Sequence, residues 1–337
     1  MRNTFKSTVL AATVLTGLMA ISPGAKANIF TPGDLVVGNY NSGSGNYNIA
    51  DYLPSSSGAL VLNQNVYLGT FESAMASTST SIIYGNFNSD IVYSINQSGV
   101  ISTLNTVSGY VSGIQTDANN NIFVSESGGY GSYNIYLTEL SSTGTVLSTK
   151  SFTLPSAGGT TGTTTFTTLS SNESTLYVHN NGNVYGINVS TGATTELYYY
   201  NSSVGSPMVV LPNGNLLFSN SVNEIQLNPN TGTVVSSTPV LNGADSGLAV
   251  DTSNSFVYGT HGGSYNITYA SLNNLSSVST LNTTNIGYTS AATVFGQYSL
   301  GTQTSSQTPA PEPASAVLLV GMLGMLVAAK YRRARSS

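Results

Sequence analysis

The sequence predicts an all-β protein whose central part closes into a six-bladed β-propeller. Three observations predict this fold: β-rich runs recur at a regular spacing, a glycine turn follows each of the first five runs, and a spare strand lies near the C-terminus. The runs start 47, 40, 54, 40 and 40 residues apart, and about 44 residues is the length of one four-stranded blade. They cover residues 35–37, 82–84, 122–124, 176–178, 216–218 and 256–258.

The turns mark the same register as the runs. Each is a Ser-Gly or Thr-Gly pair, and glycine supplies the positive φ that a hairpin turn needs. In the sixth repeat Asn274 takes the equivalent place, and asparagine is the residue that next most readily adopts this conformation. The turn glycines are Gly58, Gly99, Gly144, Gly192 and Gly232.

A further short strand is expected before five of the runs. Segments 112–117 (Ser-Gly-Ile-Gln-Thr-Asp) and 246–251 (Ser-Gly-Leu-Ala-Val-Asp) are two similar examples. The first run has no such strand before it, whereas residues 289–295 form an extra strand at the far end. A ring explains both facts, because the C-terminal strand completes the N-terminal blade and closure removes sheet edges. A seventh blade within 122–176, a pair of β-sandwiches and a β-helix are the alternatives.

Residues 1–27 are expected to be a secretory signal peptide, which the export translocon recognises. Arg2 and Lys6 precede an apolar stretch, and residues 25–27 (Ala-Lys-Ala) have the small-x-small form of a cleavage site. A membrane helix is the alternative, but the stretch is short and diluted by Ser and Thr. The protein is therefore expected to be exported, with a propeller domain over 28–303.

A Pro-rich linker over 304–313 and a hydrophobic segment with a basic tail over 314–337 follow the predicted propeller. The first sixteen residues of the last segment contain no charged side chain. As a helix they would reach about 24 Å, slightly less than the thickness of a hydrocarbon core. The Lys and Arg residues that follow are expected to stay cytoplasmic. The tail is expected to span the inner membrane and hold the exported body there.

This tail resembles the PEP-CTERM sorting signal of Gram-negative bacteria. The resemblance rests on Pro311, Glu312 and Pro313, on the hydrophobic span, and on Arg332 with Arg333. It implies processing near the Pro-Glu-Pro by a membrane exosortase, followed by release or transfer to the cell surface or extracellular matrix. Such proteins usually accompany exopolysaccharide production and biofilm. An ordinary C-terminal anchor is the alternative.

The net charge of the part between the leader and the tail limits the classes of partner that it can bind. Residues 28–310 contain one cation, Lys150, and twelve acids, and so carry a net charge of −11. A body with one cation cannot neutralise a row of phosphates, which excludes nucleic-acid binding. The chain has no Cys, so disulfides and thiolate chemistry are excluded too. The abundant Tyr, Asn and Ser suit carbohydrate, where Tyr stacks and amides bind hydroxyl groups.

The body resembles the NHL and gluconolactonase-like group of propellers. The resemblance rests on segments 112–117 and 246–251, each followed by a β-rich run. Gluconolactonase-type propellers gather Glu, Asn and Asp around calcium in the central channel. The resemblance therefore implies a calcium site near Asp117 and Asp251, which end inner strands and carry oxygen ligands that suit calcium. The alternative is that each Asp binds the amides of its own Asn-rich turn.

Only two histidines occur, His179 and His261, each at the end of a predicted strand and two blades apart. One interpretation is a shared ligand or general base at one mouth of the ring. The other is a pair of surface or strand-end residues without a role in chemistry.

Two functions are compatible with these features. The leading hypothesis is an exported, surface-sorted propeller that binds exopolysaccharide or another matrix component through Tyr and Asn at the loop mouths, without catalysis. The alternative is an extracellular calcium-dependent lactonase or lyase, with the ion near Asp117 and Asp251. A structural matrix component without a specific ligand is a third hypothesis.

Overall fold

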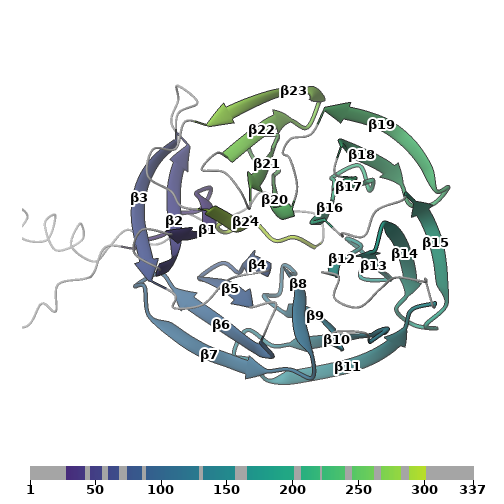
Figure 1. The fold of residues 1–337 in the computed structure, drawn as a ribbon. Helices are drawn as coiled ribbons and strands as arrows, with labels where there is room; N and C mark the ends of the chain where they lie inside the picture. The colour runs from purple at the N-terminus through teal and green to yellow at the C-terminus, as the bar shows by residue number, and fades with distance from the viewer. Residues whose placement is uncertain are drawn as a thin grey trace, which may run out of the picture. The chain divides into compact units, whose positions relative to one another are not determined.

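The computed structural model describes residues 28–300 with short gaps, and these residues form a ring of six four-stranded antiparallel sheets (Figure 1). The predicted leader (1–27), linker and tail lie outside the described residues. No helix among the described residues has the length and apolar character needed to cross a membrane. The gaps are 42–45, 55–59, 68–73, 86–88, 129–131, 156–164, 201–205, 221, 240–244, 262–266 and 282–287.

We name the sheets blades A to F in chain order and give the strands of each from the innermost to the outermost. Blade A contains β24 (Tyr288–Val294), β1 (Leu35–Asn41), β2 (Asn46–Pro54) and β3 (Leu60–Tyr67). Blade B contains β4 (Ala74–Ser77), β5 (Ser81–Gly85), β6 (Ile91–Asn96) and β7 (Ile101–Thr106). Blade C contains β8 (Tyr110–Thr116), β9 (Ile122–Ser127), β10 (Asn134–Leu140) and β11 (Val146–Thr153).

The other three blades repeat this order. Blade D contains β12 (Phe166–Leu169), β13 (Thr175–Asn180), β14 (Asn183–Asn188) and β15 (Thr194–Tyr199). Blade E contains β16 (Met208–Val210), β17 (Leu216–Ser219), β18 (Asn223–Asn228) and β19 (Thr233–Pro239). Blade F contains β20 (Asp245–Asp251), β21 (Phe256–His261), β22 (Ile267–Ser271) and β23 (Asn274–Leu281).

Blade A closes the ring in the predicted way. The C-terminal strand β24 pairs antiparallel with β1, with Leu35 opposite Val294 and Tyr40 opposite Tyr288. Three strands of this blade therefore come from the N-terminal part of the body and one from the C-terminal part. The described residues form six sheets, so the prediction of six blades is confirmed.

The hydrophobic core is divided into six clusters, and each fills the space between two neighbouring blades. Alternate residues of a strand point to opposite faces. The second strand of each blade therefore contributes side chains to two clusters, one on either face. Leu35 and Val37 of β1 pack towards blade F, whereas Val36 packs towards blade B. Burial on both faces explains why the β-rich runs are continuously apolar rather than alternating.

The inner strands touch their neighbours all round the ring, and two glycines permit the closest approaches. A Cβ atom on Gly113 would lie 2.6 Å from the carbonyl oxygen of Thr167 in the next inner strand. A Cβ atom on Gly247 would lie 2.8 Å from the Cα atom of Ala291. The similarity of segments 112–117 and 246–251 is therefore explained by a close backbone contact between blades, which each segment makes at its glycine.

Four of the five predicted turn glycines have the predicted conformation, and the fifth, Gly58, lies outside the described residues. Gly99, Gly144, Gly192 and Gly232 all have positive φ. The prediction for Asn274 was wrong: this residue does not have a positive φ, and it begins β23 opposite Ser271. Pairing resumes at Asn274 itself, so the bend falls on the two residues before it.

Every outer strand carries an irregularity that the sequence did not reveal. In each of the six blades the register between the third and the outer strand shifts once, as at a β-bulge. A bulge increases local twist and bends the strand away from a flat edge. The exposed rim of the ring is therefore made of six bent strands.

Candidate functional site

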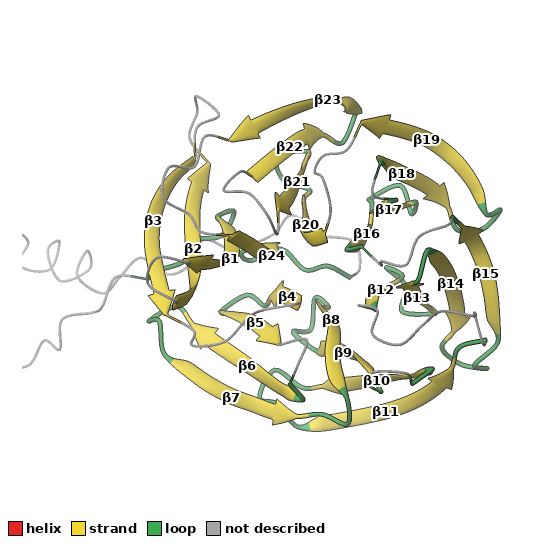
Figure 2. Cartoon of the chain, in the orientation of Figure 1, coloured by secondary structure: helices red, strands yellow, loops and turns green. Residues whose placement is uncertain are grey.

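The ring has two ends that carry different connections, which are drawn in green and grey in Figure 2. At the turn end, the innermost strand of blades B to F leads into the second, and in every blade the third strand leads into the outer one; the innermost strand of blade A, β24, comes instead from the C-terminal part of the body. At the linker end, the second strand turns into the third, and the outer strand crosses to the next blade. This division follows from the antiparallel order of all six sheets.

The two predicted calcium ligands lie at the turn end, where their own turns bind them. Asp117 directly follows β8, and its Oδ1 accepts hydrogen bonds from the backbone amides of Asn119 (2.9 Å) and Asn121 (2.8 Å). Asp251 ends β20, and its Oδ1 accepts a bond from the Asn254 amide (3.0 Å) while its Oδ2 accepts one from Asn254 Nδ2 (2.7 Å). The alternative in which each Asp holds its own turn is thus confirmed.

This arrangement does not fit a shared calcium site. Asp117 and Asp251 come from blades C and F, which are three blades apart in a ring of six. N–H donors already face their carboxylate oxygens, where a cation would have to bind. Among the residues that the structure describes, no three Asp, Glu or His side chains gather into a group that could hold a metal ion.

Residues 295–300, which we call the closing strap, cross the turn end after β24 (Figure 1). The Gly296 amide donates to Ser77 Oγ of blade B (2.6 Å). Farther along, the Leu300 amide donates to the Thr116 carbonyl of blade C (3.0 Å), and the Thr116 amide donates to Ser299 Oγ (2.9 Å). The strap therefore joins the ends of inner strands that belong to different blades.

The strap also binds the carboxylate of Asp251. Gln297 Nε2 donates to Asp251 Oδ1 (2.7 Å), and Gln297 Oε1 accepts a bond from the Thr252 amide (2.9 Å). Leu300 is fully buried in the cluster between blades C and D, where it lies with Leu169. The strap thus connects blades B, C and F at the turn end.

His179 lies at the linker end of β13 and is fully buried between blades D and E. Its Nδ1 lies 3.1 Å from the backbone nitrogen of Ser206, and its Nε2 lies 2.8 Å from the Tyr200 hydroxyl. The Tyr200 hydroxyl in turn donates to the Ser219 carbonyl (3.3 Å). Nδ1 also lies 3.0 Å from the Ser206 carbonyl oxygen, so both ring nitrogens have a partner whichever of them carries the proton.

Burial lowers the pKa of His179 to about 4, so the ring is neutral near neutral pH. Its two nitrogens are engaged inside the protein, which makes it a structural tie between two blades. His261 ends β21, two blades away, and its side chain lies outside the described residues. The residue that directly follows each β-rich run is Gly38, Gly85, Ser125, His179, Ser219 and Gly259. His179 is the exception in that series, which the sequence alone could have shown.

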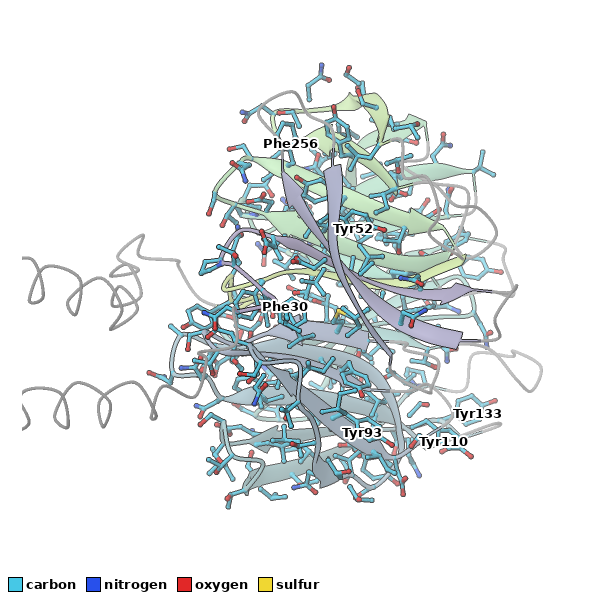
Figure 3. The ribbon with its side chains drawn as sticks, turned by 90° about the vertical axis from the view of Figure 1, so that its left-hand side faces the viewer. Phe30, Tyr52, Tyr93, Tyr110, Tyr133 and Phe256 are labelled. Atoms are coloured by element: carbon cyan, nitrogen blue, oxygen red, sulfur yellow. The ribbon has the colours of Figure 1, made fainter. Side chains whose placement is uncertain are left out.

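Tyrosine and asparagine side chains project at the linker end of blades C and D, and we call this set the tyrosine face. Tyr199 is 59% exposed and Tyr133 is 36% exposed. Asn134 is exposed and Asn181 is half-buried. Figure 3 shows Tyr110 and Tyr133 at the same end of the ring. The face consists of Tyr110, Tyr133, Asn134, Asn181 and Tyr199.

Local sequence explains how two of these residues are presented. Asn181 has a φ of 52° and Gly182 a φ of 73°, as in the Asn-Gly turn that favours a tight hairpin. Tyr199 lies opposite Asn183 at the base of that hairpin. The Oδ1 of Asn181 is buried, and it has no hydrogen-bond partner among the described residues. Tyr199 is therefore the exposed group of this blade end, whereas the Asn181 acceptor is covered.

Glu126 lies beneath this end without contributing charge to its surface. It is fully buried, and its Oε2 accepts bonds from the amides of Ser108 (2.9 Å) and Gly109 (3.1 Å) in the crossover from blade B. Burial raises the pKa of its carboxyl group. Like His179 in blade D, Glu126 ties a crossover to a strand end.

The fold is similar to that of solved structures with different names. A protein of unknown function from Bacteroides caccae matches with a TM-score of 0.56 and 17% identity, over 78% of this chain and 98% of that one. A chain of the nidogen/laminin complex matches with a TM-score of 0.58 and 13% identity, over 78% and 99%. TolB from Acinetobacter baumannii matches with a TM-score of 0.54 and 14% identity, over 85% and 71%.

At these identities the likeness shows the propeller fold alone. No protein-family model matches the chain, and no curated protein matches it. A function has to be argued from the site itself.

Proposed function

We propose that the protein is an exported, non-catalytic propeller that binds exopolysaccharide of the biofilm matrix through the tyrosine face. The observation that carries the proposal is the exposure of Tyr133 and Tyr199, together with that of Asn134, at the linker end of blades C and D. An exposed aromatic ring can stack on the apolar face of a sugar, and an amide can both donate to and accept from its hydroxyl groups. The turn end has exposed asparagines but no exposed tyrosine among the described residues, so it lacks a surface on which a sugar could stack.

The proposal includes delivery to the cell surface. The leader over 1–27 supports export through the translocon, and the tail with Pro311, Glu312 and Pro313 supports processing by an exosortase. Replacement of Arg332 and Arg333 by alanine should leave an unprocessed form in the inner membrane. An immunoblot of cell fractions measures this form, and normal release of the double variant would rule out sorting by this tail.

Binding is tested by co-sedimentation of the full chain, purified in detergent, with exopolysaccharide from the producing cells. Saturable binding is expected, and Tyr199→Ala should weaken it at least about tenfold, the effect of losing one central aromatic contact. Leu147→Ala is the matched control, because Leu147 is also exposed (51%) but lies on β11 near the turn end. Equal binding by both variants and the unchanged chain would remove the tyrosine face from the proposal.

A further inference from the structure

We infer that the tyrosine face selects uncharged glycans and rejects polysaccharides that carry carboxylate or sulfate groups. This inference rests on the proposed function and names its ligand class. It is carried by the charges that the fold places around this end of the ring.

No positive charge is available to an anionic ligand at the tyrosine face. Lys150 is the one Lys or Arg between residues 28 and 300, and its Nζ donates to the Val189 carbonyl (3.3 Å) across the rim between blades C and D. The ring of His179 is buried and neutral, with both nitrogens already bonded. Recognition of carboxylate or sulfate normally uses Arg or Lys, and this end supplies neither.

The acids of the linker end add a field of the opposite sign. Asp90 is exposed in the connection between β5 and β6, and Asp245 begins β20. With a net charge of −11 over residues 28–310, an acidic polymer is repelled over distances of about a Debye length, roughly 8 Å at physiological salt.

The groups that remain match a neutral sugar. Tyr133 and Tyr199 offer aromatic rings and hydroxyl groups, and the exposed Asn134 offers an amide donor and acceptor. Sugar hydroxyl groups are both donors and acceptors, so they can bind such a surface without a charged partner. Contacts of this kind do not involve ions, and binding should therefore be insensitive to salt.

The test compares three polymers with the full chain in detergent: dextran as the neutral glycan, alginate as the acidic one and chitosan as the basic one. Binding is measured by co-sedimentation at low and at high salt, for the unchanged chain and for Tyr199→Ala. The inference expects dextran to bind with an affinity that changes less than about twofold with salt and falls about tenfold in Tyr199→Ala. Alginate should not bind.

Three results would overturn the inference in distinguishable ways. Alginate binding that equals or exceeds dextran binding would show that the missing cations do not decide selectivity. Chitosan binding alone, lost at high salt and unchanged in Tyr199→Ala, would show non-specific attraction to the negative body. Absence of binding to all three polymers and to exopolysaccharide from the producing cells would reject the proposed function itself.

Discussion

The turn end and the linker end of the ring use polar side chains in opposite ways. At the turn end, Asp117 and Asp251 accept hydrogen bonds from their own turns, and the closing strap connects blades B, C and F. At the linker end, Tyr133 and Tyr199 stay exposed, while the buried polar residues beneath them tie the crossovers. The difference teaches that a carboxylate at the end of an inner strand is no sign of a site until its hydrogen bonds are counted.

Removal of the strap's anchor should disturb the turn end most. Leu300 is fully buried between blades C and D, so Leu300→Ala should lower the free energy of unfolding by about 4 kcal/mol, from lost burial and a residual cavity. Urea denaturation measures the change. Leu147→Ala, at a half-exposed site, should cost less than about 0.5 kcal/mol. Equal losses for the two variants would show that the strap is not docked.

His179, which ties blades D and E at the linker end, should make the free energy of unfolding depend on pH. The pKa of His179 falls from about 6.5 in the unfolded chain to about 4 in the folded protein. The folded state therefore binds fewer protons, and its stabilisation is present above pH 6.5 and lost as the pH falls towards 4. The loss from this group is about 3 kcal/mol. His179→Ser, which copies Ser125 and Ser219 of the neighbouring blades, should remove this part of the slope.

Two buried acids change the stability in the opposite direction. Burial raises the pKa of Asp34 and of Glu126, so the folded state holds their protons more tightly and loses that stabilisation as the pH rises through the raised values. The difference between His179→Ser and the unchanged protein cancels both terms. An identical difference at pH 7 and pH 4.5 in chemical denaturation would contradict a neutral, buried His179.

A comparison of two glycine variants tests the close packing of the inner strands between the two ends. Gly113→Ala should cost about 2 kcal/mol, because its Cβ would meet the backbone of Thr167 and force two inner strands apart. Gly186→Ala is the matched control, since its Cβ would lie 3.3 Å from a movable Leu197 side chain. Thermal melting of the two variants should separate them clearly. A melting temperature shared by both would contradict the close approach of β8 and β12.

The smallest effect is expected from Asp251→Asn. The asparagine keeps the shape but weakens the bonds from Asn254 and Gln297, for a loss of about 1 kcal/mol. Millimolar calcium should leave the melting temperature of the unchanged protein within about one degree, because a ligand stabilises only the state that it binds. A calcium-dependent rise that disappears in Asp251→Asn would restore calcium at this end and, with it, the hypothesis of a lactonase or lyase.

Most of the fold could be predicted because a propeller repeats local structure. Each blade is a series of hairpins whose turns and apolar runs are visible within about 44 residues, and the unmatched strand near residue 290 indicated the closure. The strap could not be predicted in this way. Ser299 binds Thr116 across 183 positions, and residues 295–300 follow no periodic pattern that would announce the contact.

The candidate site was predictable in kind but not in place. Composition indicated Tyr and Asn contacts, yet exposure separates Tyr199 from the stacked pair Tyr84 and Tyr93, and exposure depends on packing between blades. The similar Ser-Gly segments directed attention to Asp117 and Asp251. In the structure the glycines of those segments permit the close approach of inner strands, and their aspartates accept hydrogen bonds from the turns that follow.

The bent outer strands affect how readily the rim of the ring can pair with another chain. β3, β7, β19 and β23 contain no charged residue, although lysines commonly guard exposed strand edges against pairing with another chain. Here the bulge in each outer strand supplies that protection through backbone geometry. Such protection cannot be titrated by acid or masked by salt. A densely deposited protein of this kind would therefore resist fibril formation through swings of pH and salinity that would disarm a charged rim.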